Sequence, residues 1–160
     1  MKAHVLVVAA IACTLGLGGA AHAEGQSLSS AYHLSSGASF VGATLSRDFV
    51  SLNDHKLRVR GTVSYLAGTR DSSGTGSHAA DRIEVGLATR NTMVRGKPAF
   101  SVLDLGYCVT RYEQLEQDYR DSGLMFAFGL GAHISESASL LGKYVGGIDS
   151  GARIAMEIEF

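Results

Sequence analysis

The feature of this sequence that most limits its fold is a period of two in hydrophobicity that recurs along the chain. In the last ten residues, "GARIAMEIEF", one set of alternate positions is entirely apolar: Ala152, Ile154, Met156, Ile158 and Phe160. The other set is small or charged: Gly151, Arg153, Ala155, Glu157 and Glu159. Alternate side chains of a β-strand point to opposite faces. The pattern therefore predicts a strand with one face in an apolar medium and one in a polar medium.

Similar alternation marks several other segments of the chain. It is clear in "KLRVRGTVSYL", "DRIEVGLATR", "FSVLDLGYCVT" and "GLMFAFGLGAHI", and weaker in "SLSSAYHL", "ASFVGATLSR" and "ASLLGKYVGG". Together with the last ten residues, these segments predict eight strands of about ten residues each. That length is enough for a tilted strand to cross a lipid bilayer.

The first 23 residues read as a secretory signal peptide. They combine a basic start at Lys2, an apolar run over residues 5–16 and a small-residue stop at 21–23. We expect cleavage after Ala23, which leaves residues 24–160 as one domain. An alternative is that Cys13 is a lipidated cysteine, although the residues before it, 10–12, fit such a site poorly.

Composition excludes several classes of protein. The formal net charge is −1, so nothing indicates a nucleic-acid partner. Only Cys108 remains after the predicted cleavage site, which excludes a disulfide within the mature chain. No apolar run long enough for a spanning helix follows the signal peptide.

Alternation alone does not say which face meets water. In a soluble barrel or sandwich the apolar face points inward, whereas in an outer-membrane barrel it points to lipid. The polar faces of the expected strands are rich in small residues: Gly86, Gly106, Ala127, Gly129, Gly131 and Ala155. A narrow barrel of eight strands has little interior room, so small polar-face residues favour a polar interior.

A signal peptide, eight alternating strands and a strand ending in Phe160 resemble the small outer-membrane β-barrels of Gram-negative bacteria, the OmpA-like and OmpX-like group. The resemblance implies an all-β fold, an eight-stranded antiparallel transmembrane β-barrel, located in the bacterial outer membrane. It implies outer-membrane lipid and lipopolysaccharide as surroundings, and a monomer. In this group the terminal strand is read by the barrel-assembly machinery, and the matching positions here are Ile154, Met156, Ile158 and Phe160.

Charged residues on the polar faces form the main candidate site. Both signs occur in similar number, and unpaired buried charge is very costly. We therefore expect an ion-pair network that plugs the lumen, with an ion-selective path as the alternative. The network is predicted at Arg58, Arg60, Arg82, Glu84, Asp104, Arg153 and Glu157.

Two long polar segments, residues 68–79 and 111–122, are predicted to be extracellular loops that could contact a host or another surface. The expected role is therefore structural, in the envelope, or adhesive, through these loops. Two alternatives are a periplasmic soluble β-barrel that binds a small apolar ligand, and a lipid-modifying outer-membrane enzyme. His78 beside Ser77, and His133 near Ser135, do not form a histidine–serine pair at the outer rim. We expect no catalytic site, no metal site and no cofactor.

Overall fold

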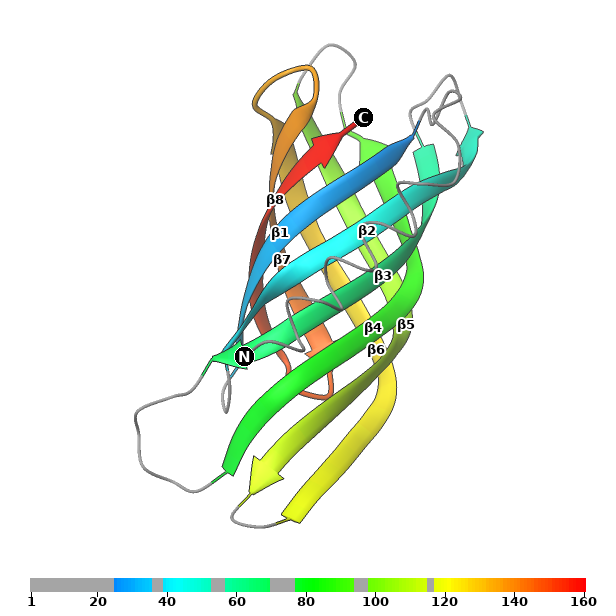
Figure 1. Ribbon diagram of the computed structural model, residues 1–160. Coiled ribbons are helices and arrows are strands. Elements are labelled where there is room, and N and C mark those ends of the chain that lie inside the picture. The colour runs from blue at the N-terminus through cyan, green and yellow to red at the C-terminus, as the bar shows by residue number, and fades with distance from the viewer. Residues whose placement is uncertain (1–24, 36–38, 53–56, 70–76, 94–97, 115–116) are drawn as a thin grey trace.

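Eight antiparallel strands close into one barrel in the computed structural model (Figure 1). The structure describes residues 25–35, 39–52, 57–69, 77–93, 98–114 and 117–160, without the side chains of 77–80, 114 and 117–119. The predicted signal peptide and its cleavage site lie outside these residues. The strands are β1 (Gln26–Ser35), β2 (Ser39–Leu52), β3 (Leu57–Thr69), β4 (Ser77–Thr92), β5 (Ala99–Gln114), β6 (Gln117–His133), β7 (Ala138–Gly147) and β8 (Gly151–Glu159).

Each strand pairs with its neighbours in sequence, and β1 pairs with β8 to close the ring. The all-β class and the eight strands predicted from the sequence are therefore confirmed. No helix among the described residues is long and apolar enough to cross a membrane.

The barrel has two distinct ends, which we call the terminal end and the far end. Gln26 and Phe160 meet at the terminal end, where the Phe160 amide donates a hydrogen bond of 3.0 Å to the Gln26 carbonyl. The turn at 134–137 lies at this end as well. The β7–β8 turn at 148–150 lies at the far end, where β5 ends and β6 begins (Figure 1).

Strands β4, β5 and β6 are longer than predicted, with 16, 16 and 17 residues. The β5–β6 ladder runs out to Gln114↔Gln117, whereas β6 and β7 pair only from Met125↔Gly147. A three-stranded sheet therefore projects beyond the barrel at the far end (Figure 1).

This projection corrects the prediction that residues 111–122 form a loop. Apart from 115–116, which the structure does not describe, these residues belong to strands β5 and β6. Their polar side chains hide the strand period, but the backbone groups pair across the hairpin, as at Arg111↔Arg120. Of the other predicted loop, residues 68–69 belong to β3 and 77–79 to β4, and 70–76 lie outside the described residues.

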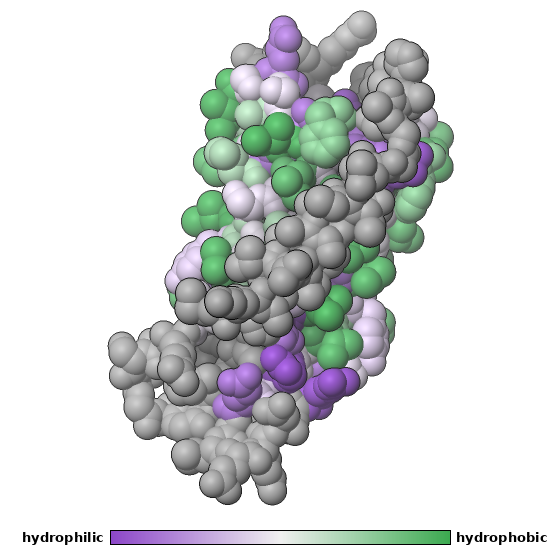
Figure 2. Space-filling model, viewed as in Figure 1, coloured by the Kyte–Doolittle hydropathy of each residue, from purple (hydrophilic) through white to green (hydrophobic). Residues whose placement is uncertain are grey.

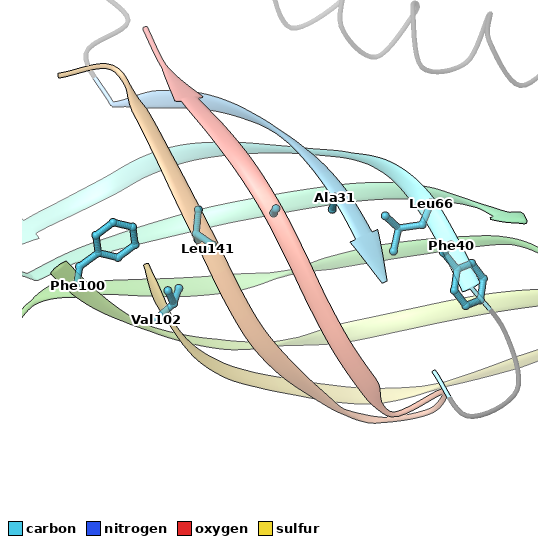
Figure 3. Close-up of a cluster of buried hydrophobic side chains, with 7 residues drawn as sticks. Ala31, Phe40, Leu66, Phe100, Val102 and Leu141 are labelled. Atoms are coloured by element: carbon cyan, nitrogen blue, oxygen red, sulfur yellow. The ribbon is translucent and has the colours of Figure 1, made fainter. Parts of the chain in front are cut away.

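Inside the barrel, apolar side chains occupy positions near both ends and between them. Phe40 and Leu66 lie together toward the far end, and Phe100 lies toward the terminal end, with smaller side chains between them (Figure 3). All three large side chains are at most 1% exposed. The polar residues that share these inward faces form the candidate site.

Candidate functional site

The two faces of the barrel wall differ sharply in chemistry. Large apolar side chains point outward from every strand, and most are about half exposed. We call this surface the apolar belt; Figure 2 shows part of it, with hydrophilic residues gathered near the lower end, which is the far end. Its members are Leu28, Tyr32, Leu34, Val41, Val63, Ile83, Val85, Leu87, Leu103, Leu105, Tyr107, Leu124, Phe126, Phe128, Leu130, Leu140, Tyr144, Ile154, Met156 and Ile158.

The inward face carries most of the buried charge. On β4 the alternation places Arg82, Glu84 and Arg90 inside and Ile83, Val85 and Leu87 outside. Twelve charged groups face one another in the described interior, six cationic and six anionic. They are Arg58, Arg60, Arg82, Arg90, Lys143 and Arg153, with Asp48, Glu84, Asp104, Asp149, Glu157 and Glu159.

One cluster lies toward the terminal end. Glu157 of β8 accepts hydrogen bonds from Arg60 Nη1 at 2.6 Å and from Arg90 Nη2 at 2.7 Å. Arg60 also donates through Nε to Asp48 at 2.6 Å. Arg58 lies 3.3 Å from Glu159, which Arg90 also contacts. This cluster joins β2, β3, β4 and β8 through the interior.

A second cluster lies toward the far end. Arg153 Nη1 and Nη2 donate to the two oxygens of Glu84 at 2.7 and 2.6 Å, a bidentate arrangement. Arg82 Nε donates to the same carboxylate at 2.7 Å. The side chains of Arg82, Arg153 and Glu84 are at most 4% exposed. Each charge is therefore paired where desolvation would otherwise be most costly.

Between the clusters, Lys143 of β7 donates to Asp104 of β5. A cavity of about 40 Å³ remains there, lined in part by the hydroxyl groups of Ser29, Thr44 and Ser64. Its size allows about one water molecule. Side chains thus fill most of the described interior.

The β7–β8 turn covers the far end of the interior. Arg82 Nη1 donates to the Ile148 carbonyl at 2.8 Å, and His33 Nε2 donates to the Asp149 carbonyl at 2.9 Å. The Tyr112 hydroxyl donates to the Asp149 carboxylate. Ile148 packs against the buried cluster of Cys108, Met125, Ala127 and Val145. Three strands thereby hold this turn across the barrel mouth.

All seven residues named from the sequence as a lumen network lie on the inward face and make ion pairs. Sequence reasoning did not name Asp48, Asp149 and His33, which the structure adds to the two clusters. Asp48 is an even-numbered position of the same strand as the inward Thr44 and Ser46, so the alternation in the sequence could have predicted that it faces the lumen. Asp149 lies in a turn with a φ of 53°, where no periodicity applies. Lys56, which shares the polar-face parity of Arg58 and Arg60 in the sequence, lies outside the described residues.

Of the two histidine–serine pairs considered from the sequence, the structure describes only the one at His133, and the partner of this histidine is a different serine. His133 Nδ1 lies 2.9 Å from the Ser139 hydroxyl, not from Ser135, and this pair is at the terminal end. Ser139 is 1% exposed, so a substrate has little access to its hydroxyl. The side chains of Ser77 and His78 lie outside the described part. No group of three or more metal-ligating side chains occurs among the described residues.

The remaining residues singled out from the sequence lie on the face of the wall that their odd or even position in the strand predicts. Ile154, Met156, Ile158 and Phe160 line the outward face of the last strand, exposed by 48–63%. Cys108 is buried on the lumen side, and its thiol donates weakly to the Gly123 carbonyl at 3.6 Å.

Comparison with solved structures agrees with this architecture. The N-terminal β-barrel domain of Pseudomonas aeruginosa OprF superposes with a TM-score of 0.61, at 12% identity, over 84% of this chain and 96% of that domain. Neisserial surface protein A matches at a TM-score of 0.48 and 15% identity, over 84% of this chain and 94% of that one. The Yersinia pestis attachment invasion locus protein Ail matches at 0.47 and 14%, over 84% and 95%.

No protein-family model and no curated protein matches the sequence. At 12% identity, the similarity to the OprF domain concerns the fold alone. In fold, the chain is an eight-stranded barrel of the small outer-membrane type that its sequence pattern resembles.

Proposed function

We propose that this protein spans the bacterial outer membrane and serves in envelope structure or in contacts at the cell surface. The observation that carries the proposal is the reversal of the two faces of the wall. Among the described residues, twenty large apolar side chains form a belt on the outside, while twelve charged groups are paired inside. A water-exposed apolar surface of this extent would favour aggregation, whereas a bilayer would solvate it.

The soluble alternative requires the opposite arrangement. A periplasmic barrel that binds a small apolar ligand needs its apolar residues around a cavity and its charged residues in water. Here Leu105 and Phe128 face outward, and Arg82 and Glu84 are buried. The interior space of about 40 Å³ is also far below the roughly 300 Å³ of typical ligand sites.

The paired interior supports a structural role over an ion path. Every described interior carboxylate lies within ion-pair distance of a cation, in clusters that join opposite walls of the barrel. The β7–β8 turn adds a cover at the far end. We infer a closed lumen whose contacts stabilise the barrel.

The projecting β4–β6 sheet supports a role at the cell surface. With the terminal end in the periplasm, this sheet extends outside the cell. Exposed polar groups such as Glu113 and Arg120 then face the medium. We propose that a surface ligand contacts this projection, the part of the molecule that the predicted segments 68–79 and 111–122 include.

Two further elements of the proposal concern delivery. Residues 1–23 direct secretion and are removed after Ala23. The outward residues Ile154, Met156, Ile158 and Phe160 are the signal for the barrel-assembly machinery, since they present a regular apolar stripe beside β1.

Membrane fractionation tests the location. Outer membranes that contain the protein are washed with urea, and the protein is then run unboiled and boiled on a denaturing gel. Retention in the membrane and a mobility shift on boiling are expected for a closed barrel surrounded by lipid. Release by urea, or recovery from the periplasm, would refute the proposed location.

The surface role is tested by shortening the projection. Residues 113–120 are replaced by a two-residue turn, and 70–76 are shortened in a second variant, with the heat shift as a check of folding. Loss of adhesion or of serum survival in folded variants supports a surface contact. Unchanged phenotypes in both variants would leave the envelope role and reject the surface contact.

A further inference from the structure

Three glycines in the described strands face outward, and they differ in what covers them. A Cβ on Gly61 would lie 2.4 Å from the ring of Phe49, and one on Gly146 would lie 2.2 Å from the ring of Phe126. Each of these glycines is therefore covered by an aromatic ring, a known way to protect a glycine in a sheet. At Gly142 a Cβ would meet no atom within 4 Å. The wall is thus open at this one outward glycine.

Gly142 lies in a groove on the outside of the barrel. The groove has a volume of about 800 Å³ and is open along its outer side, so an occupant would lie along the wall and not be enclosed by it. Its apolar walls include Leu103, Phe128, Leu130 and Tyr144, with Phe128 and Tyr144 rings 5.6 Å apart. All four side chains belong to the apolar belt.

Strand spacing limits what the groove can hold. In the sheet register Gly142 of β7 lies between Leu130 of β6 and Ile154 of β8. Two strand spacings of about 4.8 Å separate these neighbours, and their side chains fill part of that width. The remaining gap suits one hydrocarbon chain and is too narrow for an α-helix, which is about 10 Å across.

One side of the groove is polar but uncharged. Thr89, Asn91 and Ser101 line it on β4 and β5, and Asn91↔Ser101 and Ser101↔Leu130 are register pairs that continue to Gly142. The one charged lining residue, Lys143, donates to Asp104 inside the barrel. The groove therefore combines an apolar channel with neutral hydrogen-bonding groups, which matches an ester-linked acyl chain.

We propose that this groove binds one acyl chain of a phospholipid, with Asn91 and Ser101 beside its ester or headgroup. The source follows from position, because Asn91 and Ser101 lie within three residues of the terminal-end limits of β4 and β5. The terminal end is periplasmic in the proposed function, on which this inference rests. The adjoining leaflet of an outer membrane consists of phospholipid.

Filling the groove tests the proposal. Purified, folded barrel is incubated with palmitoyl-oleoyl phosphatidylethanolamine and examined by native mass spectrometry. The wild type is expected to retain one lipid, and Gly142→Phe to retain at least fivefold less. Gly142→Ala, which leaves most of the groove, and Val41→Phe, on the outward face of β2, are expected to match the wild type.

A photoreactive phosphatidylethanolamine gives a second readout that needs no variant. Crosslinks are expected on peptides of β5, β6 and β7 around the groove. Even labelling of all strands, equal retention by Gly142→Phe, or binding of lipid A in place of the phospholipid would overturn the proposal. So would a dimer that Gly142→Phe converts to a monomer without change in lipid. The mobility shift on boiling distinguishes a failure of this proposal from a failure of the proposed function. If the wild type shows no shift, the proposed location in the membrane is contradicted, and not the acyl-chain site alone.

Discussion

Arg153 on β8 and Glu84 on β4 are joined through the barrel interior by two hydrogen bonds of 2.7 and 2.6 Å. In a closed ring of eight strands, β4 and β8 lie on opposite walls. The pair therefore acts as a cross-strut between these two walls, which the backbone ladders around the ring do not link directly. Arg82 donates to the same carboxylate, so Glu84 contacts two buried guanidinium groups, and Asp149, 3.6 Å from Arg82, supplies a second negative charge.

Glu84→Gln is expected to destabilise the barrel strongly. The amide keeps the shape of the side chain but removes the one described anionic partner of Arg153 and leaves Arg82 with Asp149, at 3.6 Å. Loss of one member of a buried ion pair typically costs about 3–5 kcal/mol. The measurement is urea unfolding in lipid vesicles, followed by the mobility of the folded form on unboiled gels.

Asp81→Asn provides the control for this substitution. Asp81 pairs with Arg111 at 2.9 Å, but their side chains are 18% and 30% exposed. Pairs with this much water contact contribute about 0–1 kcal/mol. An equal loss of stability in both variants would show that the interior charges are solvated and that the cross-strut contributes little.

The inward and outward positions of this barrel could be predicted from the sequence because alternate residues of a strand point to opposite faces. Arg82, Glu84 and Asp104 were assigned to the lumen on that basis, and they line it. Which charges meet was not predictable. Partners such as Arg60 and Glu157 come from β3 and β8, and their relative height depends on the stagger of the whole ring.

The alternation in the sequence also did not predict two irregular features of the strands. A register shift between Asp48 and Val50 breaks the parity at the end of β2, so Phe49 and Val50 are both exposed. The hairpin around residues 111–122 is polar on both faces because it projects beyond the apolar belt. Without an apolar face it carries no period of two, and a strand there resembles a loop.

Leu105→Arg tests whether the belt faces hydrocarbon. Leu105 is 60% exposed and lies midway along β5, with the belt residues Leu87 and Phe126 as cross-strand neighbours. An arginine at the midplane of a bilayer costs about 2–4 kcal/mol, whereas an exposed site in water would tolerate it. Unfolding in lipid vesicles measures the difference.

Ser122→Arg is the matched change beyond the belt. Ser122 is exposed on β6 at the far end, where its hydroxyl accepts a hydrogen bond from Tyr107. Near an interface the expected cost is about 0–1 kcal/mol. If both arginine variants unfold at the wild-type urea concentration, the belt does not lie in a bilayer.

Asp149→Val is expected to loosen the cover at the far end. Asp149 has a φ of 53°, a conformation that is strained for a β-branched residue. Valine also removes the carboxylate that accepts the Tyr112 hydroxyl. The combined loss is about 2–3 kcal/mol. Asp149→Asn, which tolerates this conformation and keeps an acceptor oxygen, should lose about 1 kcal/mol or less. Equal urea midpoints for the two variants would contradict a structural role for this turn.

Phe160→Ala separates assembly from stability. The Phe160 side chain is 63% exposed, so its removal takes little packing from the folded barrel, and its backbone bond to Gln26 remains. If the outward stripe is an assembly signal, the amount of folded protein in the membrane falls severalfold, while the free energy of unfolding of that fraction stays within about 0.5 kcal/mol of the wild type. Ile134→Ala removes a similarly exposed apolar side chain, 65% exposed, from the same end and should leave the yield unchanged. Equal yields of all three proteins would remove Phe160 from the proposed signal, whereas a lower midpoint for Phe160→Ala would assign the residue to stability.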